Sequence, residues 1–353
     1  MQILSTSTVP GDDVVHHRMA SGGSSLRGRL SAWLERAADA DAVVLSGSVS
    51  LGTRYDQLIA ARTFAKRYPR RPVVLADCTW EPGSRALDRL LRTERPVAVD
   101  RPARHGGRAT RWAISRLRAP NIHCCVLSSA EGRTFPGFWG IDPANVHVTP
   151  YWASNLGALQ AARDALEPGV DVVAGEGADG SDGAAVLVFA GGDSLRDYRP
   201  LLEAAEAVRA PVRIATRLPV PDTLPANVTA GPVSGEEFLR LAVSAPVAVV
   251  PLVPDALRSG GQKTYLGAMG LGQTVIVPEA PGVLDHVRPD VTGLVPPAGD
   301  ARALAEAVNA AVTDPALRAR LGAAAEADVA ERFSPRAYGE RLYGIARELV
   351  ERG

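Results

Sequence analysis

The sequence predicts an α/β protein with two doubly wound domains, each built on a parallel sheet. Its 353 residues, 46% of them apolar, suffice for two domains of about 150 residues each. Short β-branched apolar runs alternate along the chain with longer segments rich in Ala, Leu and Arg that have helical period. This alternation is typical of a parallel sheet, because the chain must cross back over the sheet between successive parallel strands.

The first half of the chain carries five predicted strands, each a short apolar run. These runs lie at 2–5, 42–45, 72–76, 123–127 and 146–149. Between them, apolar residues at helical spacing predict helices over 24–38, 55–68 and 84–91.

The second half repeats this order of elements. Predicted strands lie at 185–190, 212–215, 247–250, 274–277 and 293–295. Predicted helices lie at 198–208, 235–243, 263–269 and 301–312. Residues 173–183, VAGEGADGSDG, are small and acidic, which is typical of a linker or an exposed loop.

This pattern divides the chain into four parts. We expect a first domain over 1–165, a linker over 166–183, a second domain over 184–334 and a last segment over 335–353. Ligands of doubly wound domains bind beyond the carboxyl ends of the strands. A ligand shared by both domains is therefore expected in the cleft between them.

Composition argues against several classes of protein. No apolar run reaches the roughly 18 residues that a membrane-spanning helix needs, and the opening residues, MQILSTSTVPGDD, do not resemble a secretory signal. The three cysteines, Cys78, Cys124 and Cys125, are too few for a disulfide framework or a four-ligand zinc site. We therefore expect a cytoplasmic protein without a metal ion.

Charge is distributed unevenly between the two halves. Residues 1–150 hold 21 basic and 13 acidic side chains, net +8, whereas residues 151–353 hold 18 and 26, net −8. Nine arginines lie between Arg89 and Arg118. They form either a solvated helical face or a surface for an anionic partner or an anionic membrane, which would place the protein peripherally at that membrane. No nucleic-acid-binding motif accompanies them, so we expect no nucleic-acid partner.

Two glycine segments precede predicted helices and are candidates for anion binding. The first contains Gly22, Gly23 and Ser24, where backbone N–H groups at a helix start suit an anion. An ordinary turn with a serine cap fits this segment equally well.

The second glycine segment is SGGQKTYLGAMGLG, residues 259–272, between two predicted strands. Gly260 and Gly261 permit a close backbone approach, and Gln262, Lys263 and Thr264 open the helix. Lys263 adds a positive charge. This combination favours a diphosphate ligand.

The order of motifs in the second half resembles the carboxyl-terminal domain of glycosyltransferase family 4. The resemblance runs from about residue 185 to residue 333, and Arg196 looks like the basic phosphate contact of that family. The segments that carry it are Val188–Gly192, Arg196–Ala204, Ala248–Leu252, Leu266–Gly272, Gly282–Val287, Gly293–Pro297 and Asp314–Gly322.

This resemblance implies the GT-B fold, in which two Rossmann-like domains face each other across a cleft. It implies transfer of a hexose from a nucleotide diphosphate sugar, with retention, without a metal or other cofactor. The amino-terminal domain would bind an unidentified acceptor, and residues 335–353 would form a helix that crosses back onto that domain. The implied donor-binding residues are Gly22, Gly23, Ser24, Arg196, Ser259, Gly260, Gly261, Gln262, Lys263 and Thr264.

The sequence departs from the family at two positions. Family members commonly carry two glutamates with seven residues between them, the first near the donor sugar and the second near the ribose. The matching positions here are Ser259 and Gly267. Three explanations stay open: Ser259 makes a weaker sugar contact, the donor is unusual, or transfer has been lost. Gln262 could supply a replacement amide.

The first domain must contribute groups that position the acceptor. Asp77, which follows a predicted strand, and His105, which lies between Arg104 and Gly106, are the candidate catalytic residues. A helix or turn cap for Asp77 and a solvated loop for His105 are the simpler interpretations.

Two other functions remain possible for such a fold. One is a non-catalytic nucleotide-sugar binder or partner subunit, since both motif glutamates are replaced. The other is a sugar-nucleotide epimerase, which would need acidic and basic side chains where Ser259 and Gly267 stand. Fold alone does not decide among them, and the oligomeric state stays open.

Overall fold

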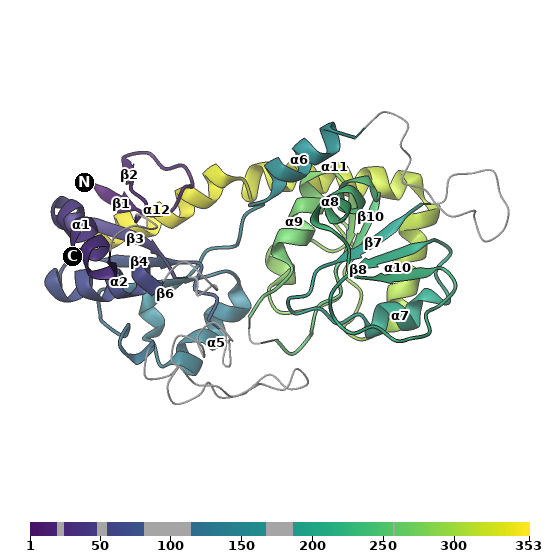
Figure 1. Ribbon diagram of the computed structural model, residues 1–353, viewed down its shortest axis with the longest axis horizontal. Helices are drawn as coiled ribbons and strands as arrows, with labels where there is room; N and C mark the ends of the chain where they lie inside the picture. The colour runs from purple at the N-terminus through teal and green to yellow at the C-terminus, as the bar shows by residue number, and fades with distance from the viewer. Residues whose placement is uncertain (20–24, 48–54, 81–113, 167–185, 257) are drawn as a thin grey trace. The chain divides into compact units, whose positions relative to one another are not determined.

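The computed structural model describes residues 1–19, 25–47, 55–80, 114–166, 186–256 and 258–353 of the chain. They form two compact units (Figure 1). The first unit comprises Met1–Tyr151 and Pro335–Gly353, and the second comprises Trp152–Ser334. The first unit therefore contains both ends of the chain.

The described part of the first unit is built on a six-stranded parallel sheet in the order β2-β1-β3-β4-β5-β6. The strands are β1 (Ile3–Ser5), β2 (Val14–His16), β3 (Ala42–Ser46), β4 (Val73–Ala76), β5 (Ile122–Val126) and β6 (Val146–Val148). The strands β3, β4 and β5 are almost entirely buried, which explains why they read as continuous apolar runs.

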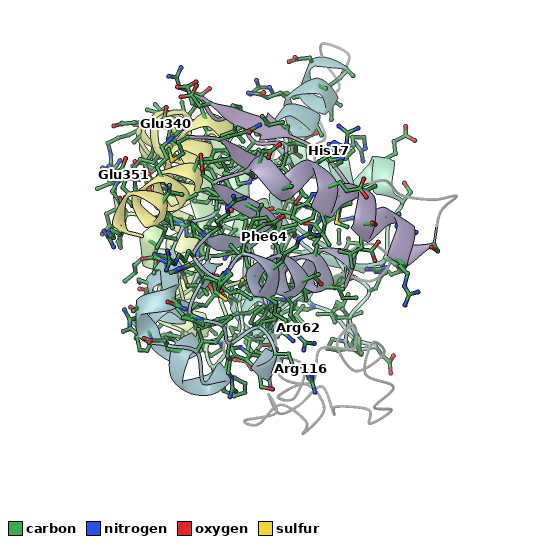
Figure 2. All side chains as sticks on the ribbon, turned by 90° about the vertical axis from the view of Figure 1, so that its left-hand side faces the viewer. His17, Arg62, Phe64, Arg116, Glu340 and Glu351 are labelled. Atoms are coloured by element: carbon green, nitrogen blue, oxygen red, sulfur yellow. The ribbon has the colours of Figure 1, made fainter. Side chains whose placement is uncertain are left out.

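Helices cover this sheet. They are α1 (Leu26–Arg36), α2 (Tyr55–Arg67), α5 (Ser129–Trp139) and α12 (Pro335–Arg352). Trp33, Phe64 and Trp139 are fully buried between helices and strands. Figure 2 shows Phe64 inside the unit, whereas Glu340 and Glu351 project outward from α12.

Although α12 comes from the far end of the sequence, it packs on β3 and β4 of the first unit. Its buried face carries Tyr338, Leu342 and Tyr343. Tyr343 donates a hydrogen bond to the carbonyl oxygen of Val9 at 3.2 Å. The buried face of this amphipathic helix thus packs against the sheet of the first unit.

The described part of the second unit holds a five-stranded parallel sheet in the order β11-β10-β7-β8-β9. Its strands are β7 (Val188–Gly191), β8 (Val212–Ala215), β9 (Val228–Gly231), β10 (Val247–Val249) and β11 (Thr274–Ile276). From β7 the chain first builds toward β9 and then reverses toward β11. The space beyond the carboxyl ends of β7 and β10 is therefore the topological switch point, where such sheets bind ligands.

Six helices surround this second sheet among the described residues. They are α6 (Leu156–Asp164), α7 (Arg199–Ala205), α8 (Gly235–Ser244), α9 (Gln262–Gly270), α10 (Ala301–Thr313) and α11 (Pro315–Arg332). The core between them consists mostly of Val, Leu and Ala side chains.

The predicted fold class, two doubly wound parallel-sheet domains, is confirmed. Individual elements differ from the prediction. Residues 293–295 form an isolated bridge from Leu294 to Ile276 rather than a strand, and β2, β9, α5, α6 and α11 were not predicted. The helix expected at 84–91 and the linker segment 173–183 lie outside the described residues.

The helix α6 lies within residues 1–165, where the first domain was expected, but its contacts are with α8 and α9 of the second unit. Leu159 of α6 is buried together with Val243 and Leu271. The contacts therefore place the change between units at Tyr151 and Trp152. No helix in the described ranges is both long and apolar enough to cross a membrane.

Candidate functional site

The loops that follow β7 and β10 lie beside each other at the switch point of the second sheet. Arg196 and Leu252 form an antiparallel bridge. The backbone N–H of Val253 donates to the carbonyl oxygen of Leu195 at 3.1 Å. Leu195 has a φ of 55°, a left-handed conformation that costs a non-glycine residue energy and is common at functional sites.

Arg196 places a buried guanidinium at this point. Only 9% of the residue is exposed, and its Nη2 donates to Thr264 Oγ1 at 2.9 Å. Its Nε donates to the carbonyl oxygen of Gly191 at 3.2 Å and its Nη1 to that of Ser194 at 2.9 Å. Burial lowers the pKa of the Arg196 guanidinium; Tyr198, Tyr265 and the nearby Asp193 carboxylate oppose this fall, and the positive charge of Arg258 adds to it.

Every described hydrogen-bond partner of Arg196 is therefore an uncharged oxygen. Withdrawing a cation from water is costly unless an anion accompanies it. A buried guanidinium whose hydrogen-bond partners are all uncharged oxygens has the chemistry to bind an anionic ligand.

The helix α9 starts directly beside Arg196. Gly261 caps it with a φ of 77°, and a Cβ at this position would lie 2.9 Å from Leu252 Cδ2 and 3.0 Å from Val250 Cγ1. Both the conformation and the space require glycine. The first backbone N–H groups of α9, at the positive end of its dipole, thus lie close to the guanidinium.

Ser259 and Gln262 bind each other. The Nε2 of Gln262 donates to Ser259 Oγ, and both side chains are buried. Gln262 therefore orders the segment that precedes the helix, and its amide nitrogen is already engaged by Ser259.

Lys263 is exposed and forms no hydrogen bond or ion pair within the described ranges. It is the second residue of α9 and so lies in the first turn of that helix. Of the donor-binding residues expected from sequence, the structure thus brings together Arg196, Gly261 and Thr264, with Ser259, Gly260, Gln262 and Lys263 adjacent to them.

Arg258 is a residue of this site that sequence reasoning missed. Its Nη2 donates to Ser194 Oγ at 3.1 Å and its Nη1 to the carbonyl oxygen of Ser259 at 3.1 Å. Ser194 consequently contacts both guanidiniums, through its hydroxyl and through its carbonyl. A basic residue two positions before a glycine pair was the available signal.

The missing second glutamate has a packing explanation. A Cβ at Gly267 would lie 2.5 Å from Leu159 Cδ1, and a Cβ at Gly270 would lie 2.7 Å from Leu156 Cδ1. The two glycines lie three residues apart on one face of α9 and let α6 approach its backbone closely. A side chain at position 267 would require Leu159 on α6 and the Asn155 amide at its start to move.

Asp77 lies at the carboxyl end of β4 in the first unit. Its φ is 56°, and its Oδ1 accepts a hydrogen bond from Tyr338 Oη at 2.5 Å. Burial raises the pKa of the Asp77 carboxyl, and the hydrogen bond from Tyr338 partly opposes that rise. A carboxyl group with a raised pKa can accept and return a proton more readily than an ordinary aspartate.

The remaining predicted site residues, Gly22, Gly23, Ser24 and His105, lie outside the described residues, as does most of the Arg89–Arg118 stretch. Within the described ranges, no group of three or more His, Cys, Asp and Glu side chains could hold a metal ion. A cavity of ≈ 370 Å³ lies at the amino-terminal ends of β10 and β11, near Pro246 and Gln273, whereas the anion site lies beyond the carboxyl ends of β7 and β10.

Comparison with known proteins identifies the fold. No protein-family model and no curated protein matches the sequence. Solved structures of glycosyltransferases do match nearly the whole chain. The chain has the GT-B fold.

Three structures illustrate the match to GT-B proteins. A glycosyltransferase from Rickettsia africae has a TM-score of 0.61 at 12% identity, over 99% of this chain and 90% of its own. HepE from Anabaena, in complex with UDP, has a TM-score of 0.61 at 14% identity, over 99% and 100%. Sucrose-phosphate synthase from Thermosynechococcus elongatus has a TM-score of 0.58 at 17% identity, over 96% and 84%. At such identities the likeness shows the GT-B fold, and function must be argued from the site.

Proposed function

We propose that this GT-B protein is a glycosyltransferase that moves a sugar from a nucleotide diphosphate sugar to an acceptor. The observation that carries the proposal is the buried guanidinium of Arg196, bound to uncharged oxygens and placed beside the glycine-capped start of α9. A diphosphate would accept hydrogen bonds from these donors at the switch point of the sheet, and its negative charge would be balanced by the guanidinium.

The donor that we propose to test first is UDP-glucose. Structures of Anabaena HepE with UDP, and with UDP-glucose, are among those similar to this chain. The base and the sugar are contacted by loops that vary among such proteins, so other nucleotide sugars belong in the same test.

In the proposed reaction, the bond between the sugar C1 and the diphosphate oxygen breaks, and a bond from C1 to the acceptor oxygen forms on the same face. The proton of the acceptor hydroxyl passes to the departing diphosphate. Arg196, Lys263 and the N–H groups at the start of α9 stabilise the charge that develops on that diphosphate. These groups supply positive charge without a metal ion.

The first unit is proposed to bind the acceptor, with Asp77 and His105 as its catalytic residues. Asp77 combines a strained backbone, a hydrogen bond from Tyr338 and a raised pKa at the carboxyl end of a strand. The Arg89–Arg118 stretch supports an anionic or membrane-associated acceptor and a peripheral location on the cytoplasmic side of a membrane.

A second candidate function is nucleotide-sugar binding without transfer. It is favoured by the replacement of both motif glutamates by Ser259 and Gly267, the latter buried under α6. Hydrolysis of the donor in the absence of an acceptor distinguishes the two. Slow release of UDP from UDP-glucose by the wild-type protein, abolished in Arg196→Gln, supports the transferase, whereas binding without any release supports the binder.

A further inference from the structure

Asn155 begins α6 but does not cap it with its side chain. As the residue before the first helical position, with φ of −112° and ψ of 3°, it forms no side-chain hydrogen bond to the helix. An asparagine at this position ordinarily accepts a hydrogen bond from the second or third helical N–H. Its amide is therefore available for another contact.

The Asn155 amide lies against the backbone of α9 instead. A Cβ placed on Gly267 would be 3.3 Å from both Oδ1 and Nδ2 of Asn155. Its Oδ1 is buried and accepts no hydrogen bond from the residues that the structure describes. An amide oxygen without a donor is costly to bury, which indicates that a hydrogen-bond donor is still to be supplied.

The anion site lies one helical turn away. Thr264, which accepts the hydrogen bond from Arg196, is three residues before Gly267 and on the same side of α9. One turn of an α-helix advances about 5 Å. The Asn155 amide thus lies beside α9 about one helical turn from the residue that binds Arg196.

In a nucleotide diphosphate sugar, the part next to the diphosphate is a ring with hydroxyl groups, either the ribose or the transferred sugar. A hydroxyl can donate to an amide oxygen, and a half-turn of the amide exchanges its oxygen and nitrogen positions with little change in shape. We propose that Asn155 accepts a hydrogen bond from a hydroxyl of the ring attached to the diphosphate. This inference rests on the donor binding proposed above.

Affinity measurements with four ligands test the inference: pyrophosphate, UDP, 2′,3′-dideoxy-UDP and UDP-glucose. The variants are Asn155→Ala and Asn155→Asp, with Gln160→Ala on the same helix as the control. We expect Asn155→Ala to weaken UDP binding about threefold to tenfold, to leave pyrophosphate binding unchanged and to bind dideoxy-UDP as the wild type does. Asn155→Asp keeps an acceptor but adds a negative charge near the diphosphate, so it should bind UDP more tightly than Asn155→Ala only at high salt, where that repulsion is screened.

Comparison of UDP with UDP-glucose also shows whether the ribose or the transferred sugar donates the hydrogen bond to Asn155. Loss confined to UDP-glucose, with UDP unchanged, assigns the hydrogen bond to the transferred sugar and supports the inference in that form. Equal affinity of Asn155→Ala and wild type for both UDP and UDP-glucose overturns it. An equal loss for pyrophosphate also overturns it, because the role of Asn155 would then be structural.

Failure of the underlying function has a different signature. If the wild-type protein binds neither pyrophosphate nor any of the nucleotides, the proposed donor site is absent and the inference falls with it. If the wild type binds them and Asn155→Ala binds UDP and UDP-glucose as tightly as the wild type does, the donor site is supported and the inference about Asn155 is overturned.

Discussion

Tyr338 donates a 2.5 Å hydrogen bond to Asp77, which lies 261 positions earlier in the chain. The bond ties the buried face of α12 to the carboxyl end of β4 inside the first unit. The last helix therefore contributes directly to the environment of the candidate catalytic carboxyl.

Replacing Tyr338 by Phe should destabilise the protein by about 1 kcal/mol, because the partly buried Asp77 loses its hydrogen-bond donor. The same change should raise the pKa of Asp77 further, since the Tyr338 bond lowers it. Urea denaturation measures the first effect. An unchanged midpoint in Tyr338→Phe would mean that the bond does not form in solution.

The raised pKa of Asp77 also makes the stability of the folded protein depend on pH. The folded state holds the Asp77 proton more tightly than the unfolded state, whose value is near 3.8. The stability from this group is present below that pH and is lost as pH rises through the folded pKa. Asp77→Asn should therefore gain stability relative to wild type between pH 4 and pH 7 in denaturation curves. A constant difference across that range would contradict the raised pKa.

His123 and His147 predict a loss of stability on the acid side. Their rings touch through Nδ1 and Nε2 at 3.2 Å. Burial lowers the pKa of His123 to about 4, and the neighbouring charge of His147 lowers it in the same direction. Burial also lowers the pKa of His147. The stability that they contribute is present above about pH 6.5 and is lost as pH falls toward 4. A His123→Asn, His147→Asn double variant should lose less stability from pH 7 to pH 5 than wild type does.

Adding a side chain at Gly267 should disrupt the packing of α6 on α9. Gly267→Ala places a Cβ 2.5 Å from Leu159 Cδ1 and should cost about 1 to 3 kcal/mol in thermal or urea unfolding. Gly157→Ala on α6 is the matched control, because a Cβ there meets nothing within 4 Å. Gly267→Glu should not improve UDP affinity. A gain in affinity would show that Leu159 does not exclude a side chain at position 267.

Lys263 should contribute modestly and in a salt-dependent way. Because it is exposed, Lys263→Ala is expected to weaken UDP binding about twofold to fivefold at low salt, and less at high salt. Calorimetric titration at two salt concentrations measures this, with Lys66→Ala as the control. If Lys263→Ala binds UDP at low salt as tightly as the wild type does, Lys263 does not contribute to donor binding.

Local sequence signals predicted the parts of the site that depend on local chemistry. Gly261 and the residues after it start a helix where the glycine pair indicated one, and Arg196 lies beside Thr264. The fold class followed from the alternation of short apolar runs with helical segments, because both sheets are parallel and buried. Pro315 after Asp314 was an unused start signal for α11, since Asp314 caps that helix.

Other features depend on contacts between distant segments, which a single sequence does not reveal. From the sequence, Gly267 marked only the loss of a functional carboxylate. In the structure, the space that a side chain at position 267 would need is filled by Leu159, which lies 108 residues earlier in the chain. Asn155 gave no signal, because its relevance comes only from the packing of α6 on α9. The partner of Asp77 was hidden for the same reason.

Calorimetric titration of the wild-type protein and of Arg196→Gln with UDP-glucose and UDP tests the central claim most directly. The account predicts that the wild type binds at least one of the two and that Arg196→Gln binds it about tenfold to a hundredfold more weakly, because a charged hydrogen bond to the diphosphate is lost. Equal affinity in the two proteins would show that Arg196 does not bind the diphosphate and would contradict the account.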